Sequence, residues 1–134
     1  MKLELRVDAQ GYRLSLDGQL LAHLGGGAAA LLAGAGPRLR EADLEAAIER
    51  AEDWLMPSSR SWQGMEIWVR DDAGRLRAGM GGAQSLTSDE VERAFSCAVD
   101  DATRGRAISA EFVADLLLLR ELVHHGKVTR VHLE

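Results

Sequence analysis

The chain has 134 residues and a formal net charge of −5. This acidity argues against a nucleic-acid binder, whose affinity depends on neutralising phosphates. A single cysteine, Cys97, leaves no internal disulfide, and the alternating charged and apolar residues at the start lack the apolar stretch of a signal peptide. We therefore expect one cytoplasmic domain, residues 1–132, and no membrane partner. The last two residues, Leu133 and Glu134, are interpreted as the remnant of an expression tag.

Three strands are predicted at the start of the chain. Apolar side chains alternate with charged ones from Leu3 to Val7, and the alternation returns from Tyr12 to Leu16. Asp17-Gly18 is a strong two-residue hairpin signal. A third strand over Gln19 to Leu24 would complete an antiparallel meander.

The uncharged, glycine-rich segment 20–36 admits two interpretations. In the first, Gly25 to Gly27 end the third strand and Ala28 to Ala33 form a short packed helix. In the second, the segment is a mobile apolar loop that docks on another chain, since exposed apolar patches usually mark contact sites.

An amphipathic helix is predicted over Arg38 to Met56, and Pro57 ends it. The acidic side chains of its outer face are either a solvated stripe or a docking surface for a basic partner; they are Glu41, Glu45, Glu49 and Glu52. After this helix, Met65 to Val69 and Leu76 to Met80 alternate around a turn and predict a second hairpin.

Two further helices are predicted in the last third of the chain. Thr87 and Glu90 form a capping box that begins the first of them. Ser109 is the expected N-cap of the second and Gly126 its left-handed terminator. Because a surface helix needs only one apolar stripe, the four consecutive leucines at 116–119 place this helix at the centre of the molecule.

Together these elements predict an α+β fold. Its antiparallel sheet would have about five strands, a three-strand meander plus a hairpin, with Val128 to His132 as a further edge strand. Three main helices would pack largely on one face.

No segment carries a recognisable catalytic, cofactor or metal signature. Cys97 lies in mid-helix beside Asp100 and Asp101, which disfavours a reactive thiolate. His124 and His125 point about 100° apart on a helix, so they cannot bind one ion together. We expect no catalytic residues, no cofactor and no metal site, and interpret the two histidines as helix-end caps.

The tryptophans are the most informative side chains for function. Trp62 follows Arg60 and Ser61 in a polar loop, and the three could frame a shallow ligand pocket. Trp68 points away from the apolar side of its predicted strand. We expect the aliphatic parts of arginine side chains, the 20–36 segment or a second protein to pack over it. Leu118, on the opposite flank of the central helix from its main apolar face, is the other expected contact residue.

Two functions therefore remain open. In size, acidity and element order the chain resembles small dimeric bacterial chaperones and adaptors, although it lacks their opening helix. This resemblance implies a non-enzymatic protein-interaction or adaptor module that acts as a homodimer or binds another protein. The alternative is a small-ligand-binding domain or enzyme with a pocket near Arg60, Ser61 and Trp62 and beside the glycine-rich loop from Gly79 to Ser85.

Overall fold

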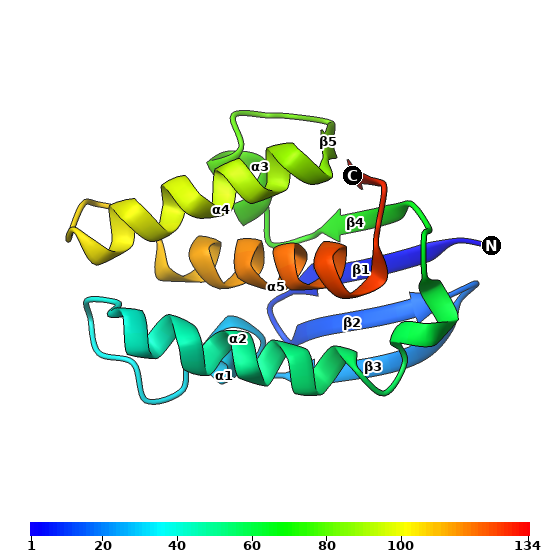
Figure 1. Ribbon diagram of the computed structural model, residues 1–134, viewed down its shortest axis with the longest axis horizontal. Coiled ribbons are helices and arrows are strands. Elements are labelled where there is room, and N and C mark those ends of the chain that lie inside the picture. The colour runs from blue at the N-terminus through cyan, green and yellow to red at the C-terminus, as the bar shows by residue number, and fades with distance from the viewer.

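A six-stranded mixed β-sheet forms one side of the molecule in the computed structural model, which describes residues 1–134 (Figure 1). The strands are β1 (Leu3–Asp8), β2 (Gly11–Leu16), β3 (Gln19–Gly25), β4 (Ile67–Asp71), β5 (Ser85–Thr87) and β6 (Arg130–Leu133). Their order across the sheet is β3-β2-β1-β4-β6-β5. Strand β1 is antiparallel to β2 and parallel to β4, β4 is parallel to β6, and β6 is antiparallel to β5.

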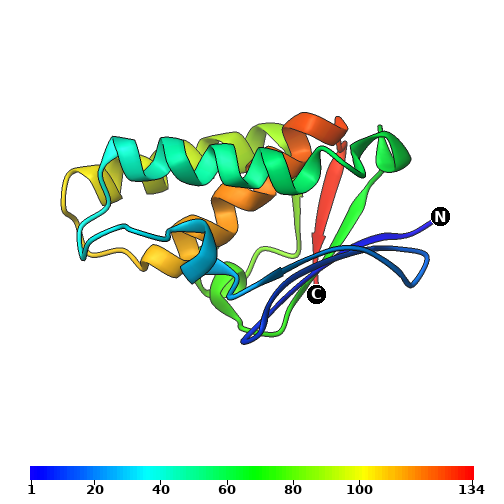
Figure 2. The ribbon, with the colours of Figure 1, turned by 90° about the horizontal axis from the view of Figure 1, so that it is seen from below.

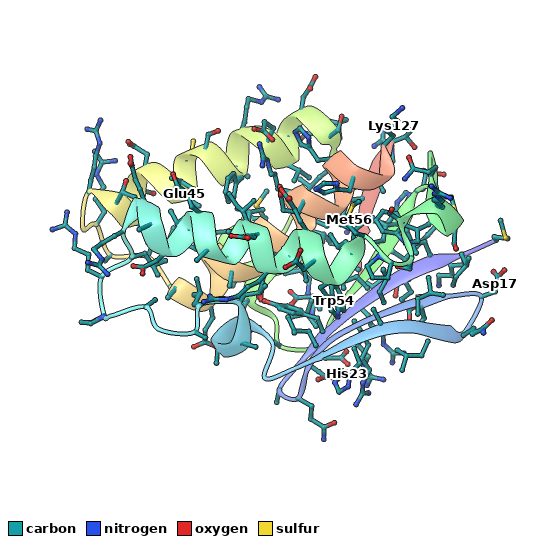
Figure 3. All side chains as sticks on the ribbon, turned by 60° about the horizontal axis from the view of Figure 1, so that its bottom comes forward. Asp17, His23, Glu45, Trp54, Met56 and Lys127 are labelled. Atoms are coloured by element: carbon teal, nitrogen blue, oxygen red, sulfur yellow. The ribbon has the colours of Figure 1, made fainter.

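The helices are α1 (Ala28–Leu31), α2 (Glu41–Leu55), α3 (Arg75–Gly79), α4 (Ser88–Thr103) and α5 (Ala110–Gly126), with a 3-10 turn η1 at Ser59–Trp62. Helices α2, α4 and α5 lie on one face of the sheet (Figure 2). The other face is polar, and His23 projects from it (Figure 3). No helix is both long and apolar enough to cross a membrane.

The predicted meander is confirmed. Asp17 and Gly18, with φ of 51° and 80°, both take the left-handed conformation of the turns that suit a two-residue hairpin. The glycine-rich segment follows the first interpretation, because β3 ends at Gly25 and the short helix α1 buries Ala28 and Leu31 against the core.

Helix α5 is the centre of the fold, as its sequence predicts. All four leucines from 116 to 119 are fully buried. They can be buried on every side because α5 packs against α2, α4, α3 and α1. Ser109 caps the helix by accepting a hydrogen bond from the Phe112 amide at 3.2 Å, and the capping box of Thr87 and Glu90 begins α4.

The prediction of an antiparallel five-stranded sheet is wrong in two respects. The second hairpin does not exist, since its expected return strand is helix α3. Gly74 adopts the left-handed conformation, with φ 75°, and Asp71 Oδ2 accepts a hydrogen bond from the Arg77 amide in the first turn of α3. These contacts start a helix, and alternation over five residues is too short to distinguish it from a strand.

The second correction is that the sheet is mixed. The segment between β3 and β4 carries α2, so β4 enters beside β1 in the same direction, and the α4–α5 pair connects the rest of the sheet to β6. Parallel neighbours require such long crossover connections. The residues Ser85–Thr87, expected in a loop and cap, form the edge strand β5 against β6.

The C-terminal residues continue this sheet. Leu133 belongs to β6 and is buried, with its amide donating to Gln84 O at 2.8 Å. The Glu134 amide donates to Val69 O at 2.9 Å. Their interpretation as a tag remnant stays a prediction, although both residues take part in the fold as it stands.

Gly126 has a different role from the one expected. It is the last residue of α5, and the left-handed residue after it is Lys127, with φ 50°. A Cβ at position 126 would lie 2.0 Å from Cζ3 of Trp62. The glycine is therefore needed because the indole of η1 packs directly on the end of α5.

We expect Gly126→Ala to lower the free energy of unfolding by roughly 1–3 kcal/mol, the usual cost of overpacking a filled core. Urea denaturation measures the change. Gly36→Ala is the matched control, because a Cβ there meets nothing within 4 Å. Equal stability of the two variants would contradict the proposed contact between Gly126 and Trp62.

Candidate functional site

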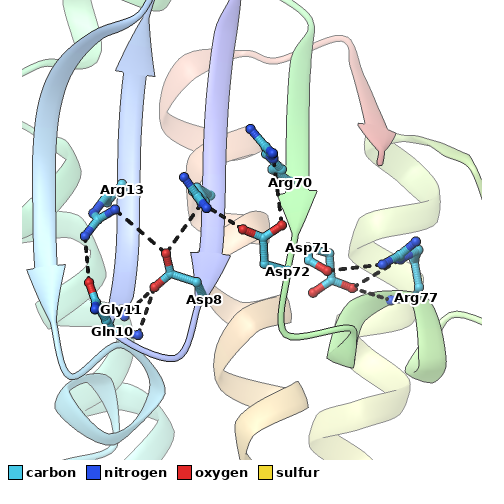
Figure 4. A network of polar contacts seen from close by, with 9 residues as sticks. Asp8, Gln10, Gly11, Arg13, Arg70, Asp71, Asp72 and Arg77 are labelled. Atoms are coloured by element: carbon cyan, nitrogen blue, oxygen red, sulfur yellow. Dashed lines mark hydrogen bonds and ion pairs between the residues drawn. The ribbon is translucent and has the colours of Figure 1, made fainter.

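The carboxyl ends of the parallel strands β1 and β4 form the edge of the sheet where a ligand site is expected in folds of this kind. Each strand leads into a short turn, 8–11 after β1 and 71–74 after β4. Figure 4 shows that acidic and basic side chains gather around these two turns. This edge therefore carries the charged side chains that could bind a polar ligand.

The charged side chains on the outer part of this edge neutralise one another. Arg6 lies between two carboxylates, with Nε 2.8 Å from Asp72 Oδ2 and 3.5 Å from Asp8 Oδ2. Asp8 Oδ1 accepts hydrogen bonds from the amides of Gln10 and Gly11, at 2.8 and 3.2 Å. Since the turn amides have an internal acceptor, they do not form an open anion-binding loop.

Asp71 is the buried acid of the edge, with 1% of its surface exposed. Its Oδ2 accepts from the Arg77 amide at 2.9 Å, and the Arg77 guanidinium is 3.8 Å away. Its other oxygen, Oδ1, has no hydrogen-bond partner in the chain. A buried carboxylate oxygen without a donor is unusual and destabilising.

A second, fully connected network lies behind the edge. Asp115 of α5, 1% exposed, accepts the hydroxyl of Tyr12 at 2.6 Å and two hydrogen bonds from Arg75, at 2.7 and 2.9 Å. Arg75 also donates to Glu111 at 3.0 Å. The network therefore ties β2, the start of α3 and the first turns of α5 together.

The ionisation of this network follows from its burial. Burial raises the pKa of Asp115, and the hydrogen bonds from Arg75 and Tyr12 act in the opposite direction. Burial and the neighbouring Asp115 carboxylate raise the pKa of the Tyr12 hydroxyl far above its ordinary value. Tyr12 therefore remains a hydrogen-bond donor at every physiological pH.

An open groove of about 700 Å³ lies beside the network, between α3, α4 and the start of α5. Most of its lining is apolar, and Arg75 is the residue that it shares with the network. The lining residues are Arg75, Ala78, Gly79, Met80, Ala94, Cys97, Ala98, Asp101, Ile108, Ser109 and Phe112. A largely apolar cavity of this size with a few polar groups is the usual form of a small-molecule site.

Gly79 shapes this groove by allowing Phe112 to pack closely. A Cβ at position 79 would lie 2.2 Å from Cε1 of the Phe112 ring. The alternative ligand pocket predicted from the sequence included the glycine-rich loop that begins at Gly79. Gly79 and Met80 of this loop line the groove.

The residues predicted to bind a ligand or partner lie elsewhere. Trp62 is fully buried, and its Nε1 donates to Ser58 Oγ at 3.2 Å. Arg60 and Ser61 are exposed in η1, and neither lines the groove. Leu118 is fully buried inside its own chain. The structure thus brings Arg60, Ser61 and Trp62 together only as neighbours in one turn.

Trp68 lies on the polar face of the sheet. Its ring stacks on that of His132, with centroids 4.6 Å apart, and Lys2 Nζ lies 5.6 Å from its centroid. A histidine and a lysine of the same chain therefore cover part of Trp68.

Sequence reasoning missed Tyr12, Arg75 and Asp115. One signal was available in the sequence, because Asp115 is an acid within the most apolar helix of the chain and directly precedes its four leucines. A charged residue there must have a partner. The partner itself, 40 residues earlier in the chain, could not be read from the sequence.

Comparisons with known proteins give structural matches alone. No family model matches the sequence, and no curated protein matches it. The Ppx/GppA phosphatase of Aquifex aeolicus, in its type II variant, matches over 98% of this chain with a TM-score of 0.66 and 10% identity. Two further Aquifex aeolicus structures, described as a PPX-GPPA enzyme and a Ppx/GppA family member, give TM-scores of 0.64 and 0.67 at 11% and 9% identity.

The chain spans about half the length of these structures, 52%, 52% and 51% of each. It therefore has a fold found in Ppx/GppA proteins.

The prediction of a non-enzymatic protein-interaction or adaptor module is wrong, because the fold is one that phosphatases use. The alternative, a small-ligand-binding domain or enzyme, is the better supported.

We expect Tyr12→Phe to lower the free energy of unfolding by about 1–3 kcal/mol, because a buried carboxylate loses one donor. Chemical denaturation of Tyr12→Phe, Asp115→Asn and the double variant tests the cause. The tyrosine substitution should cost less in the Asp115→Asn background, with a coupling of at least about 0.5 kcal/mol. Additive effects would show that the hydroxyl does not stabilise the carboxylate.

Proposed function

We propose that the chain binds a small phosphorylated molecule in the groove between α3, α4 and α5, as one lobe of a phosphatase-like enzyme. The observation that carries this proposal is an arginine with unused donors at the edge of an apolar groove. Three N–H groups of Arg75 donate to Asp115 and Glu111. A guanidinium has about five N–H groups in all, so two remain for an anion.

The position of Arg75 suits this role. Its side chain is 22% exposed, while the carboxylate that orients it is fully buried. A guanidinium held in a fixed plane loses little conformational entropy when it binds a phosphate. The apolar lining around Phe112 and Met80 is suited to the organic part of the same ligand.

The similarity in fold supports a phosphate ligand over other anions, since the matched proteins include a phosphatase. Those proteins are about twice as long as this chain. We therefore assign ligand binding to this chain, and hydrolysis to a site that a second lobe completes.

Cys97 offers a direct test, because it is the single cysteine and lines the groove. We expect phenyl phosphate to slow its reaction with a thiol reagent about tenfold at a concentration ten times its Kd. Phenol is the matched ligand without the phosphate and should protect far less. Equal protection by phenol and phenyl phosphate would contradict phosphate recognition.

Two variants separate this site from the one expected near η1. Ala94→Phe fills the groove without removing a charge, so phenyl phosphate should no longer protect Cys97. The rate for each variant is compared with that variant's own rate in the absence of ligand. Arg60→Ala removes the arginine of η1 and should leave protection unchanged. Loss of protection in Arg60→Ala alone would instead place the ligand near Arg60, Ser61 and Trp62.

A further inference from the structure

Three metal-binding side chains converge where the end of α2 packs on the end of α5. Glu52 comes from α2, and Glu121 and His125 lie one helical turn apart on α5. Their ligand atoms all lie within 4.8 Å of one another. Glu121 and His125 are about 14 and 20 Å along α5 from Phe112 of the groove, given a rise of 1.5 Å per residue, so the cluster is a separate feature.

The spacing of these atoms is close to that of a metal site. His125 Nε2 is 3.8 Å from Glu52 Oε1 and 3.9 Å from Glu121 Oε1. Ligand atoms at about 2.0–2.2 Å from a tetrahedral cation are about 3.3–3.6 Å apart. The observed separations, up to 4.8 Å, are somewhat wider, so the side chains would have to move closer together around a bound ion.

Glu121 is the observation that points to a cation. Its side chain is 3% exposed, and Oε2 accepts a hydrogen bond from Arg120 at 2.7 Å. Its other oxygen, Oε1, accepts no hydrogen bond from the chain and faces His125. A carboxylate oxygen of a buried side chain that has no donor in the chain and lies 3.9 Å from an imidazole nitrogen can share a cation with it.

The local charge also leaves room for a cation. Arg120 is divided between two acids, since its Nε lies 3.0 Å from Glu92 Oε2. Glu92 and Glu121 pair with the guanidinium of Arg120, and Glu52 lies beside His125, so three carboxylates are matched by one guanidinium and a histidine. A divalent ion would neutralise this excess of negative charge.

We propose that Glu52, Glu121 and His125 bind a divalent transition-metal ion, with Zn²⁺ as the best match to one imidazole and two carboxylates. His125 and Glu52 are 28% and 43% exposed, so the fourth position is open to water. The carbonyl oxygen of His125 accepts a hydrogen bond from Gln63 at 2.8 Å, which fixes this end of α5. The ion would join α2 to α5. This inference does not depend on the proposed function.

The sequence prediction of no metal site considered His124 and His125 as a pair and missed the glutamate four residues before His125. Residues at i and i+4 lie on the same face of a helix, and this spacing was visible in the sequence. Glu52 was assigned to an acidic outer stripe, and only the packing of α2 on α5 brings it to the other two.

Titration of the untagged chain with Zn²⁺ alone, followed by isothermal calorimetry, tests the site. We expect one ion per chain and a rise in Tm on binding. His125→Gln should weaken binding at least tenfold and abolish the rise in Tm. His124→Gln is the matched control, since its side chain is 60% exposed and lies 3.9 Å from Glu92, outside the cluster.

Cys97→Ser should leave the affinity unchanged, which excludes the thiol as the ligand. A hundredfold excess of Mg²⁺ should not displace Zn²⁺, because magnesium prefers oxygen ligands. The circular dichroism spectrum of His125→Gln shows whether the variant is folded, and Glu52→Gln, at an exposed position, provides a second test. Absence of saturable binding, or equal loss in the His124 and His125 variants, would overturn the proposal.

Discussion

The burial of α5 on all sides is the constraint on which the rest of the structure depends. A helix with apolar side chains around its circumference is stable in water only if other elements cover each side. The sheet covers one side, and α2 and α4 cover the flanks. Each fully buried leucine contributes about 1.5–3 kcal/mol to stability, so the cost of leaving α5 exposed would be comparable to the net stability of a typical domain.

The two exceptions to this apolar character mark the two sites proposed for the chain. Asp115 and Glu121 are the only buried acids of α5. Asp115 lies near the start of the helix, where Arg75 and Tyr12 satisfy it and where the groove opens. Glu121 lies near the other end, with one oxygen bonded to Arg120 and the other facing His125. A buried charge needs a partner, and Arg75, Arg120 and His125 are partners that also reach the surface.

The edge at the carboxyl ends of β1 and β4 differs from an open anion site in its internal pairing. Arg6 joins Asp8 to Asp72, and Asp8 accepts the amides of its own turn. Arg75, by contrast, keeps unused donors next to a cavity, so the proposed ligand site is the groove and not the β1–β2 turn. The Ppx/GppA structures that share this fold are about twice as long as the chain.

The sequence by itself determined the elements whose signals are local. These are the meander with its Asp17-Gly18 turn, the capping box at Thr87, the N-cap at Ser109 and the buried position of the quadruple leucine. Each depends on residues within one turn, or on the amount of apolar surface that a helix must hide.

Only the tertiary structure decided the features that join distant parts of the chain. The direction of β4 beside β1 depends on the path of α2, and α3 replaces a strand because of the turn that Asp71 and Gly74 form. Gly126 is explained by an indole that η1 brings to it, and Arg75, Tyr12 and Asp115 meet across three elements. A contact between distant residues produces no periodic pattern in a sequence, because neither residue by itself indicates which distant residue it will meet.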